Sequence, residues 1–204
     1  MRTLTAILLL IAAAFLYSCA SSPEAPPKWE AEERGIVLNL KAANKLNVER
    51  GKSYSLYLVV YQLTDPNAFN QYAEDRSGLS ELLESKIFDP SVVSVKNFVV
   101  YPGSDITYRL DRAEKAKYVG LVAGYRIMSK ERMVRLYEIP VRTETEGYIK
   151  RKKKKVPAIL EAEVKLGPDR IEAVTEPGED KNKEKDKIEE VKEVKEAGED
   201  WLRF

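Results

Sequence analysis

The chain has 204 residues, with 34 basic and 33 acidic side chains, no histidine and one cysteine. This length suits one domain with terminal extensions. The near-zero net charge gives no electrostatic reason to expect a nucleic-acid partner. The absence of histidine removes the commonest general base and the commonest transition-metal ligand. We therefore expect no enzyme activity, no cofactor, no metal site and no small-molecule substrate.

Residues 1–18 are predicted to form a signal peptide. Arg2 precedes an apolar run over residues 6–15. A helix that spans a bilayer needs roughly 20 apolar residues, so this run is too short for a membrane anchor. The segment therefore indicates export of the chain.

The end of this segment, Leu16-Tyr17-Ser18-Cys19, resembles the lipobox of bacterial lipoproteins, although Tyr17 is bulkier than the usual residue. The resemblance implies cleavage before Cys19 and acylation of Cys19. Because Ala20 stands where an aspartate would retain a lipoprotein in the inner membrane, it also implies sorting to the outer membrane. The alternative is an ordinary signal peptide with an incidental cysteine.

After the cysteine, residues 19–34 are predicted to be a solvated tether, because residues 20–27 are small, polar and rich in proline. A period of two begins at Ile36 and predicts a half-buried strand. Residues 53–63 are apolar on both faces and predict a covered central strand. Two short helices are expected next, one after Asp65-Pro66 and one over residues 78–84 with Ser77 as its cap.

Further strands are predicted by alternating or continuous apolar residues, and residues 112–117 are expected to form one helical turn. The whole pattern predicts a mainly β protein, a β-sandwich of seven to eight strands with two inserted helices, over residues 35–174. The strands that follow the helices are expected at residues 92–101, 106–110, 118–128, 133–141, 156–166 and 170–174.

Residues 175–204 are dominated by Glu, Lys and Asp, and their apolar residues are too sparse to fill a core. We predict a disordered tail or a marginal helix there. A second charged segment, residues 150–155 (KRKKKK), is predicted to be the solvated tip of a hairpin between two strands. Contact with lipid headgroups, with nucleic acid or with the acidic tail are the alternatives for this basic run.

Several segments, taken together and in order, resemble the TssJ family (also called VasD or Lip) of type VI secretion outer-membrane lipoproteins. They cover roughly residues 29–141 and include GIVLNLKAANKLN from Gly35, GKSYSLYLVVYQL from Gly51, YPGS from Tyr101, LDRAEKAKYVGLVAGY from Leu110 and RLYEIPV from Arg135. The resemblance implies a transthyretin-like β-sandwich on the periplasmic face of the outer membrane, anchored by N-terminal acyl chains. It further implies a structural function, in which the lipoprotein binds the periplasmic C-terminal region of TssM and so builds the envelope-spanning complex.

In this family the loop between the first two strands contacts TssM, which implies a partner-binding site here. Its residues are Asn44, Lys45, Leu46, Asn47, Val48, Glu49, Arg50, Gly51 and Lys52. Leu46 has two open interpretations, since an apolar side chain in a polar turn serves either as a contact or as part of the core. The alternative function is a periplasmic lipoprotein that binds a small ligand between the helices and the sandwich.

Overall fold

The structure is a computed structural model, and it describes residues 26–146 and 152–175. The predicted signal peptide, Cys19 and residues 176–204 of the predicted tail lie outside the described residues. In chain order the elements are β1 (Glu32–Ala42), β2 (Leu56–Leu63), α2 (Asn67–Ala73), α3 (Arg76–Leu83), β3 (Val92–Val100), β4 (Asp105–Arg112), β5 (Tyr118–Ala123), α4 (Lys130–Met133), β6 (Val134–Glu138), β7 (Val141–Glu146), β8 (Lys152–Pro157), β9 (Leu160–Leu166) and β10 (Ile171–Thr175).

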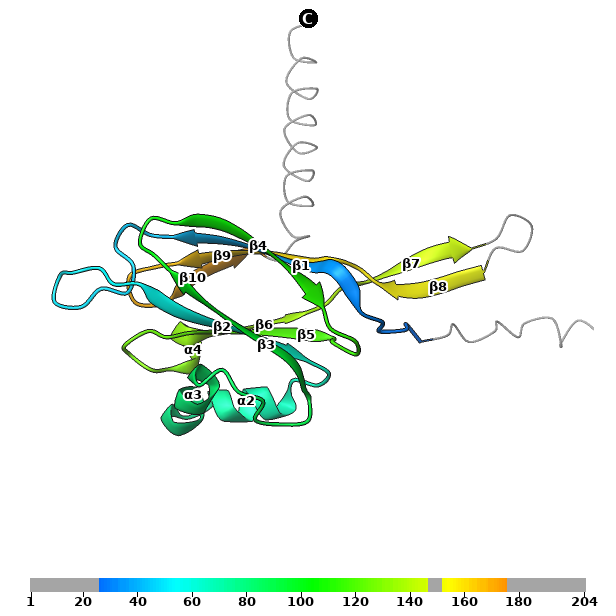
Figure 1. The fold of residues 1–204 in the computed structure, drawn as a ribbon, viewed down its shortest axis with the longest axis horizontal. Coiled ribbons are helices and arrows are strands. Elements are labelled where there is room, and N and C mark those ends of the chain that lie inside the picture. The colour runs from blue at the N-terminus through cyan, green and yellow to red at the C-terminus, as the bar shows by residue number, and fades with distance from the viewer. Residues whose placement is uncertain (1–25, 147–151, 176–204) are drawn as a thin grey trace, which may run out of the picture.

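Two four-stranded sheets form a mainly β, sandwich-like fold (Figure 1). The strand order is β10-β9-β1-β4 in the first sheet and β3-β2-β5-β6 in the second. A separate two-stranded hairpin, β7–β8, lies outside both sheets. β1 is a central strand of the first sheet, antiparallel to β4 and parallel to β9.

The core lies between the sheets because buried and exposed side chains alternate along strands such as β1. In β1, Ile36, Leu38 and Leu40 are fully buried and face the second sheet. β2 is buried over nearly its whole length, as its two-faced apolar sequence predicts. One of its faces meets the first sheet and the other is covered by the helices.

Helices α2 and α3 cover the outer face of the second sheet (Figure 1). The Tyr61 hydroxyl donates a 2.6 Å hydrogen bond to the Leu82 carbonyl of α3. Gly120 of β5 leaves room for the Phe69 ring of α2, since a Cβ at Gly120 would lie 2.6 Å from Phe69 Cζ. The contact between the helices and the sheet is therefore closely packed at this point.

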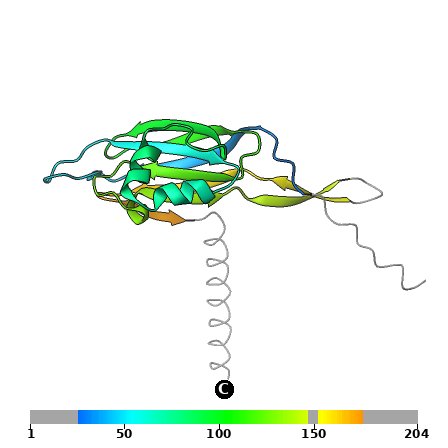
Figure 2. The ribbon, with the colours of Figure 1, turned by 90° about the horizontal axis from the view of Figure 1, so that it is seen from below.

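The parallel pairing of β1 with β9 defines the two ends of the sandwich. Ile36 pairs with Leu160, the first residue of β9, and Ala42 pairs with Leu166 where both strands end. We call the first the N-terminal end and the second the loop end. Both views place the chain's entry and the β7–β8 hairpin at the N-terminal end, and the β1–β2 connection at the opposite end of the long axis (Figures 1 and 2).

The two short helices predicted from the sequence are confirmed, with one change in capping. Asp75, not Ser77, is the cap of α3, and its carboxylate accepts a 2.8 Å hydrogen bond from the Gly78 amide. The N-cap residue of α2 is Pro66, and the carboxylate of Asp65 before it accepts a 2.9 Å hydrogen bond from the Asn67 amide.

The predicted seven to eight strands agree with the eight strands of the two sheets, and the β7–β8 hairpin adds two more in the described chain. Two expectations were wrong. Residues 152–155 of the basic run belong to strand β8 and not to a hairpin tip. No helical turn forms at residues 112–117: β4 extends to Arg112, and the following turn has Lys115 at a φ of 67°.

Candidate functional site

The β1–β2 loop (residues 43–55) projects from the loop end and closes in a tight turn. The amides of Glu49 and Lys52 each donate a 2.9 Å hydrogen bond to the other residue's carbonyl. The two central residues have positive φ angles, 48° at Arg50 and 78° at Gly51. Positive φ at both centres is the mark of a type I′ turn, which suits the right-handed twist of a hairpin. The tip therefore has a defined shape that displays Arg50.

The base of this loop is fixed to the first sheet. The Ala43 amide donates a 2.8 Å hydrogen bond to the Leu166 carbonyl, and the Val48 amide donates a 2.7 Å bond to the Pro168 carbonyl. Leu46 is fully buried and belongs to the core. Of the two interpretations of Leu46, the structure supports the core, because a side chain without exposed surface offers nothing to a partner.

The other predicted site residues fall into two groups. Asn44, Lys45, Arg50, Gly51 and Lys52 are exposed, whereas Asn47, Val48 and Glu49 are half-buried. The Asn44 and Asn47 side chains stabilise the loop. The amide group of Asn47 donates a 3.2 Å hydrogen bond to the Ser55 carbonyl, and the Asn44 side chain lies against Gly103, whose φ is 73°. The residues free to meet a partner are therefore concentrated at the tip.

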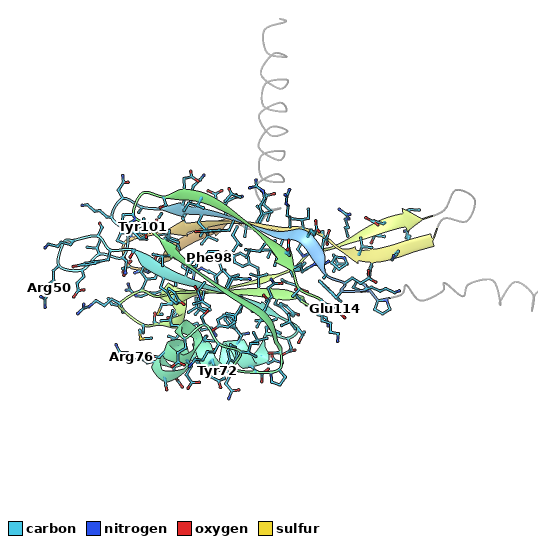
Figure 3. The ribbon with its side chains drawn as sticks, viewed as in Figure 1. Arg50, Tyr72, Arg76, Phe98, Tyr101 and Glu114 are labelled. Atoms are coloured by element: carbon cyan, nitrogen blue, oxygen red, sulfur yellow. The ribbon has the colours of Figure 1, made fainter. Side chains whose placement is uncertain are left out.

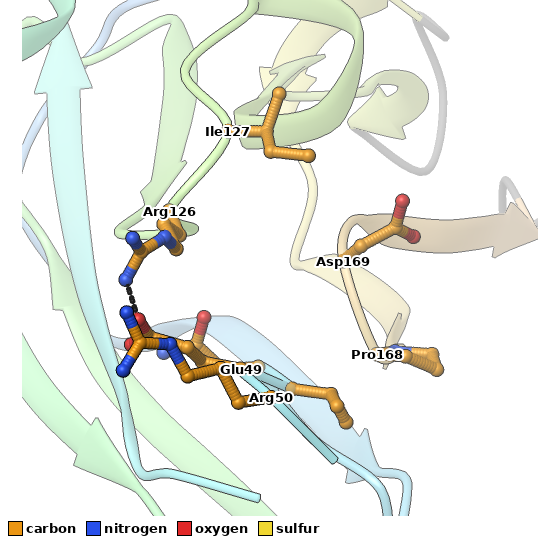
Figure 4. A pocket seen from close by; sticks show the side chains of 8 residues that line it. Glu49, Arg50, Arg126, Ile127, Pro168 and Asp169 are labelled. Carbon is orange, nitrogen blue, oxygen red and sulfur yellow. Dashed lines mark hydrogen bonds and ion pairs between the residues drawn. The ribbon is translucent and has the colours of Figure 1, made fainter. Parts of the chain in front are cut away.

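A groove of about 270 Å³ lies beside the turn (Figure 4). The β1–β2 loop forms one wall. The opposite wall comes from residues 126–127, after β5, and from residues 168–169, between β9 and β10. The lining residues are Asn47, Val48, Glu49, Arg50, Arg126, Ile127, Pro168 and Asp169.

Charges on the walls of this groove are arranged in pairs. Arg126 forms an ion pair with Glu49, and Arg132 forms one with Asp169. Asp169 also accepts a hydrogen bond from the neighbouring Arg170, and these two guanidinium groups lower the pKa of its carboxyl. Each acid that lines the groove therefore has a basic partner.

Apolar side chains are also exposed at this end. Ile127, on the groove wall, is 56% exposed, and Tyr54 of the loop is 47% exposed. Tyr101, which directly follows β3, is 63% exposed and lies toward the same end as Arg50 (Figure 3). Aromatic and aliphatic side chains beside paired charges are typical of a protein-binding surface.

Sequence reasoning found the loop but not the opposite wall. Arg126 and Ile127 were assigned to a strand over residues 118–128, but β5 ends at Ala123. Pro168 and Asp169 were assigned to a turn, which is where they lie, but nothing local indicates which loop that turn faces. The strand order, which brings these segments together, was the missing information.

No group of His, Cys, Asp and Glu suited to a metal ion occurs in residues 26–146 and 152–175. Within the same ranges no helix has the length and apolar character needed to cross a membrane. The fold and the site define a class of mainly β, sandwich-like proteins with a hydrogen-bonded loop at one end.

A profile of the type VI secretion lipoprotein family, which includes VasD, EvfM and TssJ, matches residues 34–165. The chain belongs to this family of membrane-bound lipoproteins, whose members are structural and not enzymatic. A search of curated protein sequences found no significant match.

Solved structures agree on the fold. The type VI lipoprotein TssJ1 from Pseudomonas aeruginosa is 21% identical, with a TM-score of 0.51 over 74% of this chain and 97% of that chain. Lip from Serratia marcescens, a membrane-bound component of the type VI secretion system, is 18% identical, with a TM-score of 0.52 over 70% and 97%. A chain from a structure of the TssM C-terminal domain from EAEC is 15% identical, with a TM-score of 0.49 over 69% and 96%, too distant to support an argument.

Proposed function

We propose that this chain is an assembly lipoprotein that connects the outer membrane to the periplasmic C-terminal region of TssM. Acyl chains on Cys19 anchor it on the periplasmic face, and the β1–β2 loop binds the partner. The observation that supports this proposal is the braced type I′ turn at Glu49–Lys52, which displays exposed residues at the end opposite the chain's entry. The two four-stranded sheets also favour the transthyretin-like class within the sandwich folds.

A rigid loop suits this function for a thermodynamic reason. Ordering a flexible loop upon binding costs conformational entropy, and a loop already held by backbone hydrogen bonds avoids much of that cost. Its tip combines the cations Arg50 and Lys52 with the half-buried Val48. Basic groups beside an apolar contact fit a partner surface with acidic residues around an apolar patch.

The loop assignment is tested with a variant that removes the tip contacts and keeps the turn. Arg50→Asn combined with Lys52→Ser removes both cations, and asparagine tolerates the positive φ at position 50. We expect the affinity for the TssM periplasmic domain to fall at least about tenfold, since truncated interface anchors commonly cost more than 1 kcal/mol. Titration calorimetry with the purified domains measures the change.

The matched control is Arg76→Gln, which removes an exposed charge from the first turn of α3 and leaves the loop itself unchanged. It should bind TssM as the unmodified chain does. Unchanged affinity of the double loop variant, with its unfolding curve also unchanged, would show that the partner binds elsewhere.

Membrane anchoring is tested separately. With Cys19→Ser the acylated residue is lost, and we expect the protein to leave the outer-membrane fraction for the soluble periplasmic fraction. Immunoblots of fractionated cells measure this distribution. A variant that stays entirely with the outer membrane would refute acylation of Cys19 as the anchor.

The packing between the helices and the second sheet does not favour the small-ligand alternative. It requires a cavity between the helices and the second sheet, where the Phe69 ring packs against Gly120. The groove at the loop end is open and bordered by ion pairs, which suits a protein surface better.

A further inference from the structure

The β7–β8 hairpin has two chemically different faces. Side chains alternate along a strand, and directly opposed residues of an antiparallel pair share a face. On one face Glu144 is therefore directly opposite Lys154. Two residues further along the same register, Glu146 is opposite Lys152. The other face pairs Thr143 with Lys155, Thr145 with Lys153 and Val141 with Pro157. We call this second set the lysine–threonine face; it contains no acidic residue.

The lysine–threonine face is open to solvent. Lys153, Lys155 and the two threonines are exposed, and Val141 at its base is 42% exposed. Ile159, directly after the hairpin, is 51% exposed. Cations on a strand with apolar residues at its base are a combination that suits the interface between lipid headgroups and acyl chains.

The hairpin also lies at the end of the molecule where the chain enters the fold. Its base is closed by a 2.7 Å hydrogen bond from the Ala158 amide to the Pro140 carbonyl, directly before β9 begins. The first residue of β9, Leu160, pairs with Ile36 near the start of β1. Both views show the hairpin extending from this end, away from the sandwich (Figures 1 and 2). From Cys19 to the start of β1 a fully extended chain spans at most about 45 Å, at about 3.3–3.6 Å per residue.

We propose that the lysine–threonine face rests on anionic phospholipid headgroups of the membrane that carries the chain. This proposal rests on membrane attachment through Cys19, which keeps the hairpin near the lipid surface. Each basic residue close to an anionic surface contributes about 1 kcal/mol. The attraction extends only about one Debye length, roughly 8 Å at physiological salt, so it requires close contact. Because side chains stand across a strand, a hairpin face that rests on headgroups would lay the hairpin along the membrane surface.

The test uses the chain from Ala20 onward, which lacks acyl chains. Every buried apolar residue that the structure describes lies between Ile36 and Ile171, so this chain keeps the described core. Its co-sedimentation is measured with vesicles of phosphatidylglycerol mixed with phosphatidylethanolamine, and with vesicles of phosphatidylcholine alone. We expect binding to the anionic vesicles only, and its loss at high salt.

A pair of double variants separates the face from the net charge. Lys153→Gln with Lys155→Gln removes two charges from the lysine–threonine face, and Arg142→Gln with Lys154→Gln removes two from the opposite face. We expect the first pair to weaken vesicle binding about tenfold or more, as two headgroup contacts imply, and the second pair to weaken it far less. All four positions lie outside the two sheets, so unfolding curves should coincide and exclude misfolding as the cause.

Three results would overturn the proposal. The first is an equal loss of vesicle binding in the two double variants, and the second is equal binding to neutral and anionic vesicles. The third is displacement from anionic vesicles by polyglutamate at matched charge concentration, which would show that the face binds any polyanion. Because neither TssM nor acylated protein is present, these outcomes are independent of the Cys19→Ser fractionation. If Cys19→Ser stays with the outer membrane, the anchor assignment fails; if the chain from Ala20 onward does not bind anionic vesicles, this proposal fails.

Discussion

Leu46 and Arg50 belong to two parts of the β1–β2 loop, a buried base and an exposed tip. The Leu46 side chain is fully buried, and its carbonyl accepts a 3.1 Å hydrogen bond from the Tyr54 amide across the loop. Leu46 thus joins the loop to the core, while Arg50 at the tip stays exposed. Substitutions at these two positions should have different consequences.

For Leu46→Ala we expect the free energy of unfolding to fall by about 2–5 kcal/mol, because the change removes buried methyl groups and leaves a cavity. Urea unfolding followed by circular dichroism measures this loss. Normal stability combined with loss of TssM binding would contradict the core assignment and return Leu46 to the interface.

A substitution at Gly51 measures the cost of the positive φ angle at the turn without any effect of side-chain packing. A Cβ at this position would meet no atom within 4 Å, so only the φ of 78° opposes a side chain. Gly51→Ala should lower the free energy of unfolding by about 1–2 kcal/mol, the usual cost of a left-handed conformation for a residue with a Cβ. Thermal unfolding measures it, with Lys52→Ala as a neighbouring control. Equal stability of both variants would refute the type I′ turn.

At the scale of elements, the sequence predicted well wherever a strand or helix has one apolar face. β1, α2 and α3 were found because burial on one face imposes a period of two or of 3.6 on their apolar residues, and β2 was found because both of its faces are apolar. β7 and β8 were missed because a hairpin outside the sheets buries neither face, so threonine, glutamate and lysine carry no such period. α4 has only four residues, too few to show a helical period.

The sequence pattern did not predict which strands pair with each other. Periodicity tells which face of a strand is buried, but it does not name the neighbouring strand. The parallel contact of β1 with β9 joins residues 124 positions apart in the pair Ile36–Leu160. For this reason the loop was predicted, while the wall formed by Arg126 and Ile127 was not.

At the scale of the whole molecule, two buried tyrosines link stability to pH. Burial raises the pKa of Tyr61 to about 12, from 10.0 for a free side chain. Burial, together with the nearby Glu172 and Asp169, also raises the pKa of Tyr125, whose hydroxyl donates a 3.3 Å hydrogen bond to the Gly167 carbonyl. Both shifts favour the protonated tyrosine in the folded state.

The direction in which pH changes the free energy of unfolding follows from these raised pKa values. Below pH 10 both states keep their tyrosine protons, and the stabilisation is complete. Between about pH 10 and pH 12 the unfolded chain releases protons that folded Tyr61 retains, so the free energy of unfolding should fall as the pH rises. Urea unfolding at a series of pH values measures the slope. Tyr61→Phe should make it shallower, and an identical slope in that variant would exclude Tyr61 as a cause.

One consequence of the arrangement of β1 concerns mechanical force. The segment that enters the fold and the loop proposed to hold the partner are the two ends of this one strand of 11 residues. A pull between membrane and partner therefore runs along the covalent backbone of β1. A strand already rises about 3.3 Å per residue, against a maximum of about 3.6 Å, so it can lengthen by only about a tenth. The lateral ladders to β4 and β9 hold it in place, so we expect such tension to leave the core folded.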